Sequence, residues 1–354
     1  PVAANITYHE QTDMDNIRKL REVLKTLPAF AKDYFRAIEP TTSTKTRISY
    51  AYDIRIFFQF LISQNPSLAK IGIPNLNVSV LDQLKPIDIE EYMEYLKLYD
   101  SPNDQTTITN GERGLKRKIS SLRSFYTYYY KRQAIETNPV QLVDMPKIHD
   151  KAIIRLDAGE TAALLDYIEH CGDQLTGQRK AYYEKTKLRD LAIVTLLLGT
   201  GIRVSECVGL DVEDIDFRNN GIRLIRKGGS EMVVYFGPEV EKALKDYLES
   251  RKAISPLEGH EHALFYSTQR KRIGVQAVEN LVKKYARAIT TTKKITPHKL
   301  RSTYGTTLYQ ETGDIYLVAD VLGHKDVNTT KKHYAAMDDA RRRKAATAIR
   351  LRED

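Results

Sequence analysis

A stretch without hydrophobic periodicity, from Asn138 to Asp150, divides this 354-residue chain into two parts of different character. It contains Pro139 and Pro146, and proline removes a backbone donor and interrupts regular structure. A chain of this length is usually built from two domains, and boundaries between domains fall in such segments. The sequence therefore predicts two domains joined by a linker, which we place at residues 146–156.

The part before the linker is dominated by apolar residues at helical spacing. These residues predict helices over 16–38, 45–61, 87–98 and 114–132. The stripe expected to face the core in the second helix comprises Ile48, Tyr52, Ile56, Phe57 and Phe60. We expect an all-helical domain over residues 43–145, with residues 1–42 as an N-terminal helical extension and Ser43 or Thr44 as a helix cap.

The part after the linker has mixed periodicity. Two β-rich runs, 222–225 and 232–236, flank a Lys-Gly-Gly-Ser sequence whose paired glycines predict a hairpin turn. Asp157 and Glu160 have the spacing of a capping box at a helix start. Further helices are predicted over 186–198, 240–251, 274–288, 298–312 and 315–322. The fold class is therefore mostly α with a small β-sheet (α+β).

Basic residues exceed acidic ones, with 55 Lys and Arg against 46 Asp and Glu and a formal net charge of +9. Such an excess favours a polyanionic partner, most simply nucleic acid, although mild basicity also occurs without one. Several cations of the first domain lie off the predicted apolar stripes. We expect these residues to contact DNA: Arg47, Arg55, Lys116, Arg117, Lys118 and Arg123.

Other features exclude several classes of protein. Cys171 and Cys207 lie far apart and fit no metal-ligand spacing. The longest apolar run, residues 191–198, is too short to cross a bilayer, and residues 1–10 have no signal-peptide pattern. We therefore expect a cytoplasmic protein without a membrane partner.

Arg203 is the first candidate for chemistry. An apolar helix ends at Gly199 and Gly201, and a second helix begins at Arg203. A cation at a helix N-terminus gains nothing from the macrodipole, so it needs another reason to be there, such as an anion held at the same terminus. The alternative is that Arg203 simply pairs with Glu206.

His298 and Arg301 are the second candidates, because residues three apart on a helix share a face. A guanidinium grips two phosphate oxygens, and an imidazole can move a proton. The alternative is a capped helix start with a solvated basic face.

The third set is His324, Tyr334 and Lys227. Tyr334 follows His324 by ten residues and comes directly after the basic run 331–333, which favours ionisation of the phenol and hence a nucleophilic role. Lys227 on the predicted turn could protonate a leaving oxygen. The alternatives are a packed aromatic residue, in a chain with 22 tyrosines, and a solvated turn lysine.

Taken in order, these motifs resemble those of the tyrosine recombinase (phage integrase) superfamily, which includes Xer recombinases, Cre and lambda-type integrase. The matching motifs are GTGIRVSE at 199–206, RKGG at 226–229, HKLR at 298–301, LGH at 322–324 and the C-terminal tyrosine. The resemblance covers about residues 42–340, and 45–145 is similar to the family's core DNA-binding domain. One departure is that many members have nine residues from the LGH histidine to the tyrosine, where this chain has ten. We expect the extra residue in a loop.

The resemblance implies that Tyr334 attacks a DNA phosphate and forms a 3′-phosphotyrosyl link, with release of a 5′-hydroxyl. It implies that Arg203 and Arg301 neutralise the charge that builds on the phosphate. Four further residues take supporting roles: His324 as a hydrogen-bond donor to the phosphate, Lys227 as the proton donor to the 5′ oxygen, His298 as the acceptor of the tyrosine proton and Glu206 as the support of Arg203.

The resemblance also implies the partners. The substrate is a double-stranded DNA recombination site, held by the two domains as a C-shaped clamp, and four protomers assemble on two sites. We expect no metal and no other cofactor, because the arginines supply the charge and the covalent link conserves the bond energy. The catalytic domain is expected over 157–337. The helical tail 338–354 docks either on a neighbouring protomer or on its own domain.

Integration or excision of a mobile element is the role we expect, and accessory DNA-bending or directionality proteins are left open. The main alternative is Xer-type resolution of chromosome or plasmid dimers. A type IB topoisomerase would share the chemistry, but the helical front domain and the LGH motif favour a recombinase. A catalytically inactive DNA-binding protein would be expected to lack at least one motif residue, and none is missing.

Overall fold

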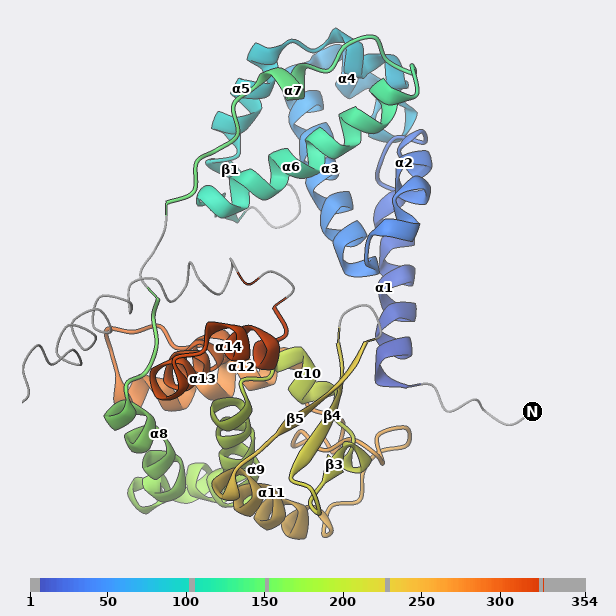
Figure 1. Ribbon diagram of the computed structural model, residues 1–354. Helices are drawn as coiled ribbons and strands as arrows, with labels where there is room; N and C mark the ends of the chain where they lie inside the picture. The colour runs from blue at the N-terminus through green and yellow to red at the C-terminus, as the bar shows by residue number, and fades with distance from the viewer. Residues whose placement is uncertain (1–6, 102–105, 150–152, 227–229, 325–326, 328–354) are drawn as a thin grey trace, which may run out of the picture. The chain divides into compact units, whose positions relative to one another are not determined.

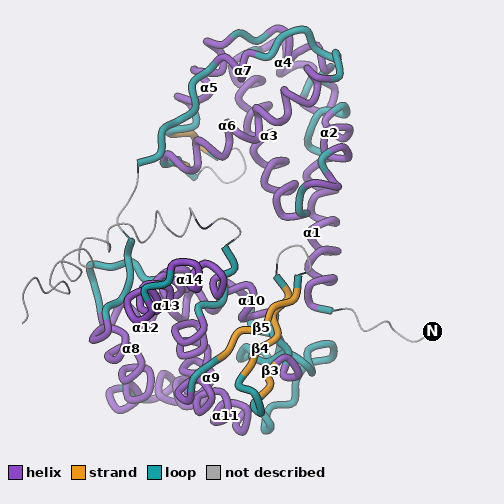
Figure 2. Tube along the Cα trace, in the orientation of Figure 1, coloured by secondary structure: helices purple, strands orange, loops and turns teal. Residues whose placement is uncertain are grey.

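The computed structural model describes residues 7–101, 106–149, 153–226, 230–324 and 327. The chain forms two compact units, Pro1–Lys151 and Ala152–Asp354. Lys227, Tyr334 and the tail 338–354 lie outside the described residues. The described part is mostly helical with small antiparallel sheets, so the predicted fold class is confirmed (Figure 2).

The first unit is a helical bundle (Figure 1). Its α-helices are α1 (Tyr8–Leu24), α2 (Ala31–Ala37), α3 (Thr44–Gln64), α4 (Pro66–Ile71), α5 (Pro86–Tyr95), α6 (Glu112–Lys131) and α7 (Pro139–Leu142). The long helix α3 packs against α1 and α6. Ser43 caps α3 as predicted, since its Oγ accepts a hydrogen bond from the Thr46 amide at 3.3 Å.

Aromatic rings fill the core between α3, α5 and α6. Phe57, Tyr92 and Phe125 are fully buried, and Phe57 meets Tyr92 edge to face with ring centroids 5.2 Å apart. The predicted stripe on α3 faces the core but was too narrow: Tyr52 and Ile56 are half-buried and pack against the core, and Ala51, Ile54 and Phe58, outside the stripe, are fully buried. The buried face of α3 is therefore wider than the stripe, because helices pack on more than one side of it.

The first unit is not all-helical, which corrects the prediction. The segment expected to complete the helix 87–98 leaves it at Tyr95 and forms β1 (Leu98–Asp100), antiparallel to β2 (Thr107–Thr109). The Asn110 side chain donates a hydrogen bond to the Leu96 carbonyl at 2.7 Å, and this bond satisfies an acceptor at the end of α5. Alternating burial in β1 and two β-branched threonines in β2 suit a short hairpin better than another helical turn.

The aperiodic stretch 138–150 is partly structured. The short helix α7 and the residue that follows it place Val140 and Val143 in the core of the first unit. Further along, Leu156 is buried, and its amide donates to Thr303 Oγ1 at 3.0 Å in the second unit. The prolines thus mark a change of direction, while the apolar residues beside them still pack.

The second unit combines helices with a three-stranded antiparallel sheet of order β3-β4-β5 (Figure 1). Its helices are α8 (Ala158–His170), α9 (Gly177–Thr200), α10 (Val204–Gly209), α11 (Pro238–Arg251), α12 (Val275–Ile289), α13 (Pro297–Thr312) and α14 (Ile315–Leu322). Its strands are β3 (Ile215–Asp216), β4 (Gly221–Ile225) and β5 (Glu231–Tyr235). The predicted strand pair and the capping box of Asp157 and Glu160 are confirmed.

Helix α9 organises the second unit and packs against α8, α11 and α13. Near its middle, Arg189 and Asp190 form a buried ion pair at 2.7 Å, and Tyr285 on α12 donates to Asp190 at 2.9 Å. A Cβ at Gly199 would overlap Val240 on α11, so close helix packing requires a glycine there. The Gly199 contact lies at the C-terminal end of α9, where the candidate site begins.

Candidate functional site

The site is built around a sharp turn at the end of α9. Gly201 has a left-handed conformation with φ 64°, which favours glycine. A Cβ at this position would overlap Tyr304 on α13 and press on Leu322 of α14. The missing side chain therefore lets the end of α9 lie close to the middle of α13 and to the end of α14. The turn also makes Arg203 the residue that directly precedes α10.

Arg203 and Glu206 form the ion pair that was considered as an alternative. Arg203 Nη1 lies 2.8 Å from Glu206 Oε1, and the Arg203 amide donates to Oε2 at 2.7 Å. The glutamate side chain is only 6% exposed, whereas that of the arginine is 41% exposed. A buried carboxylate thus orients a guanidinium that still faces outward, which is an arrangement that also suits an anion site.

Arg301 on α13 is buried, so this part of the helix is not the solvated face considered as an alternative. Its two terminal nitrogens donate to the backbone carbonyls of Gly201 and Leu322. These carbonyls end α9 and α14, where helices carry partial negative charge. Arg301 therefore binds two helix ends together. His298, one turn earlier on α13, is exposed.

His324 follows the end of α14. The chain turns at Gly323, which has φ 61°, and the His324 amide donates to the Ala319 carbonyl at 2.9 Å. The imidazole is half-buried. The Leu322 carbonyl that Arg301 binds lies two residues before this histidine, so the structure brings the LGH and HKLR motifs together.

A residue that sequence reasoning did not single out joins the same cluster. The Arg226 guanidinium comes from the end of β4 and contacts Glu206 and the end of α14. Burial lowers the pKa of Arg226, while the neighbouring Glu206 carboxylate acts in the opposite direction. The sequence feature that could have identified Arg226 as a site residue was its place in the RKGG motif, directly before Lys227.

The cluster has a clear electrostatic character. Arg203 and Arg226 pair with one carboxylate, Glu206, while Arg301 binds the carbonyl of Gly201, two residues before Arg203. An arginine stays charged at any pH at which a protein is folded. This part of the second unit therefore carries an excess of positive charge, preorganised by buried hydrogen bonds, and suits a phosphate group.

The structure corrects part of the predicted DNA-contacting set. Arg47 is buried and pairs with Glu39 at 3.3 Å, and Lys118 is buried with its Nζ 2.7 Å from Asn110 Oδ1. The prediction that these two cations lie on an exposed face is wrong, because both side chains are buried and bind acceptors of the same unit, the exposed carboxylate of Glu39 and the side-chain amide of Asn110. Arg123 donates to two backbone carbonyls next to α7, at 2.8 and 3.1 Å.

The remaining members of that set are more accessible. The Arg117 side chain is 46% exposed and pairs with the buried Asp53. Burial raises the pKa of Asp53, and the charge of Arg117 acts against that rise. Arg55 lies over the Tyr52 ring at 4.8 Å, and Lys116 is half-buried. Their contact with DNA stays a prediction.

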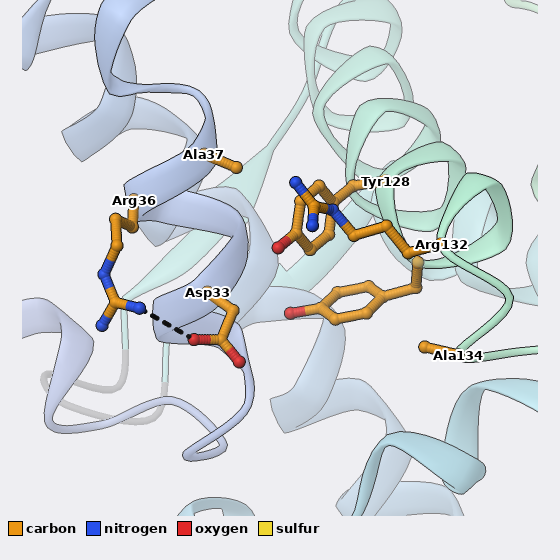
Figure 3. Close-up of a pocket in the computed structure, with 7 residues that line it drawn as sticks. Asp33, Arg36, Ala37, Tyr128, Arg132 and Ala134 are labelled. Carbon is orange, nitrogen blue, oxygen red and sulfur yellow. Dashed lines mark hydrogen bonds and ion pairs between the residues drawn. The ribbon is translucent and has the colours of Figure 1, made fainter.

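A pocket in the first unit does not form a second candidate active site. Figure 3 shows Asp33 from α2 beside Tyr128 of α6 and Arg132, which directly follows α6, with Arg36 on the other side of Asp33. Arg36 pairs with Asp33 at 3.3 Å, and Arg132 lies over the Tyr128 ring at 4.6 Å. These charged groups are therefore engaged with their neighbours. None of the residues lining the pocket belongs to the motifs.

Three further findings concern metal binding, thiol chemistry and membrane insertion. The described residues contain no group of three or more His, Cys, Asp or Glu placed to hold a metal ion. Cys171 and Cys207 are free and buried, and burial raises the pKa of the Cys207 thiol to about 12. No helix in the described part of the chain is long and apolar enough to span a bilayer.

Comparison with known proteins agrees with the motif pattern. A model of the phage integrase family matches residues 155–341, just over half of the chain. The tyrosine recombinase XerC of Caldanaerobacter subterraneus subsp. tengcongensis is 32% identical, with 94% of this chain and 90% of the relative covered. The tyrosine recombinase XerS of Streptococcus equi subsp. zooepidemicus is 29% identical, with 91% and 96% covered.

A solved structure has a similar fold. The Tn1549 transposon integrase in complex with transposon right end DNA aligns with a TM-score of 0.62 at 21% identity, covering 89% of this chain and 98% of that one. The family match and whole-chain similarity to XerC agree with the motif order and with the gathering of Arg203, Glu206 and Arg301. This chain therefore belongs to the phage integrase family and is a tyrosine site-specific recombinase.

Proposed function

We propose that this recombinase cuts and rejoins double-stranded DNA through a 3′-phosphotyrosyl link to Tyr334. The observation that carries the proposal is the convergence of Arg203, Arg301 and the end of α14 before His324 at one place in the second unit. Family membership and the position of Tyr334 in the motif order support the choice of nucleophile.

The arrangement explains how attack on a phosphodiester is favoured. Negative charge builds on the non-bridging oxygens in the transition state, and fixed cations stabilise that charge without reorganising. Glu206 orients Arg203, and two backbone carbonyls orient Arg301. We assign the tyrosine proton to His298 and protonation of the 5′ oxygen to Lys227, as the family resemblance implies.

DNA binding is proposed to use both units. In the first unit the candidates that remain are Arg55, Lys116 and Arg117. Arg47 and Lys118 are buried, and Arg123 donates to two backbone carbonyls. Phosphate contacts of this kind make affinity fall with salt. Assembly of four protomers on two sites, with the tail 338–354 exchanged between them, belongs to the same proposal.

Two biological roles fit this chemistry. We retain integration or excision of a mobile element, and similarity to the fold of the Tn1549 transposon integrase supports it. Dimer resolution of the Xer type gains support from the two relatives with Xer names, which match more than 90% of this chain. Dimers accumulating when the gene is deleted would favour dimer resolution, and loss of an excised circular element would favour the mobile-element role.

The chemistry is tested by trapping. The protein is incubated with nicked DNA fragments from the sequence flanking its gene, in the presence of chelator, and then denatured with SDS. We expect a DNA-linked band that is absent from Tyr334→Phe. A band that persists in this variant would show that another residue is the nucleophile. No band despite binding to the same fragments would contradict the proposed catalysis on that DNA.

A further inference from the structure

Arg226 occupies an unusual place for a charged residue. It is the last described residue before Lys227, and its amide donates to the Ser230 carbonyl at 2.8 Å. Its side chain is only 10% exposed. Burying a guanidinium is costly unless it has partners, so the contacts it makes inside the unit indicate its role.

The guanidinium contacts the end of α14. Nη2 donates to the Val321 carbonyl at 2.9 Å, one residue before the carbonyl that Arg301 binds. Two consecutive carbonyls at this helix end therefore each have an arginine partner. The segment that follows them leads directly into His324.

The same guanidinium lies against Gly323. A Cβ at Gly323 would overlap the Nη1 and Cζ atoms of Arg226, so a glycine is needed for contact as well as for its φ of 61°. On its other side, Arg226 Nε lies 3.9 Å from Glu206 Oε1, the oxygen that also binds Arg203. The Arg226 side chain thus connects Glu206, which orients Arg203, with the turn at Gly323 that precedes His324.

We propose that Arg226 is a positioning residue, which holds Glu206 and the Gly323–His324 turn in the arrangement that receives the phosphate. This inference rests on the proposed function, since it assigns a role within the same site. Arg226 acts through its neighbours: loss of its charge frees the Glu206 carboxylate from its second cation and leaves the Val321 carbonyl without its donor.

The first test compares Arg226→Gln and Arg226→Lys with the wild-type full chain. Single-turnover formation of the covalent product is measured on nicked DNA at saturating protein, beside the DNA dissociation constant and the melting temperature. We expect cleavage by Arg226→Gln to slow by about 10- to 100-fold. DNA affinity should change by less than about twofold, and Arg226→Lys should recover part of the rate.

The matched control is Arg223→Gln. Arg223 lies on β4, three residues before Arg226, and among the described residues its partner is Asp214 at 3.0 Å, not Glu206 or α14. It removes the same charge from β4, and we expect wild-type cleavage. Equal slowing in both variants would overturn the inference, because the effect would then come from the charge or stability of the strand.

A second test uses the contact with Gly323. Gly323→Ala should slow cleavage in the wild-type background, because its Cβ displaces the guanidinium and strains the backbone. In an Arg226→Ala background only the strain remains, so the added loss should be smaller. Strict additivity would contradict a shared action of the two residues.

The outcomes separate this inference from the proposed function. A wild-type protein that binds the DNA but forms no covalent product contradicts the proposed function. A wild-type protein that cleaves while a folded Arg226→Gln variant cleaves equally fast overturns the positioning role. If Arg226→Gln does not fold, Arg226→Lys decides: a slowed rate at unchanged affinity and melting temperature supports the role, and an unchanged rate overturns it.

Discussion

The two units both bury basic side chains but place them differently. In the first unit, the buried Lys118 and the half-buried Arg123 bind acceptors at separate points, a side-chain amide and the backbone beside α7. In the second unit, Arg226 and Arg301 bind carbonyls at adjacent positions near the end of α14, beside the Arg203–Glu206 pair. Burial of a cation alone therefore does not mark a functional site. Convergence of several cations on one place does.

The largest effect is expected for Arg301→Ala. The change removes the cation that we propose to stabilise the transition state, and it leaves two helix-end carbonyls without their donor. Single-turnover cleavage should fall by more than about 1000-fold, and the melting temperature should also fall. A folded variant that cleaves within about tenfold of the wild-type rate would contradict the claim that the converging cations of the second unit mark the functional site.

The next effect concerns the interior of the first unit. Lys118→Met leaves Asn110 Oδ1 without the lysine ammonium, so we expect the free energy of unfolding to drop by about 1–3 kcal/mol. Cleavage at saturating DNA should stay at the wild-type rate. Chemical denaturation and the trapping assay together check this expectation. A stable variant with slow cleavage would assign Lys118 to the chemistry.

A smaller effect is expected for the accessible cations. Lys116→Gln and Arg55→Gln should each weaken DNA binding a few-fold and reduce the slope of log affinity against log salt by about 1. Binding titrations at several salt concentrations measure the slope. Arg47→Gln serves as the buried control, with an unchanged slope expected. Unchanged slopes for both accessible residues would remove them from the DNA interface.

The smallest effect concerns Cys207, which is fully buried in α10 beside Glu206. Burial raises its pKa to about 12, so the reactive thiolate is scarcer at pH 8 than in a free thiol. Alkylation of the folded protein at pH 8 should be more than about 100-fold slower than in urea. Rapid labelling of Cys207 in the folded state, located by peptide mapping, would show that α10 opens readily.

Strong local patterns were predictable from the sequence. The helix 315–322 and the strand pair around 222–225 follow from periodicity, and the capping box of Asp157 and Glu160 follows from spacing. The order of motifs pointed to a cluster, and the structure brings Arg203, Glu206 and Arg301 together with the segment before His324. These features depend on a few neighbouring residues or on a motif order that the family match also supports.

Features that depend on contacts outside a single helix or strand could not be predicted from the sequence. Arg47 was expected on the surface, but its partner Glu39 lies outside its own helix. The three-residue strands β1 and β2 are too short to give a periodic signal. No sequence pattern around Arg226 predicts that it contacts Val321 and Gly323, since both lie about a hundred positions away in the chain.

The most direct measurement compares Arg203→Gln in the second unit with Arg123→Gln in the first, by single-turnover trapping at saturating DNA. Each change removes one positive charge, and only the first removes a cation from the proposed phosphate site. We predict that the covalent product forms at least about 100-fold more slowly with Arg203→Gln and at the wild-type rate with Arg123→Gln. Equal rates in the two folded variants would contradict the account.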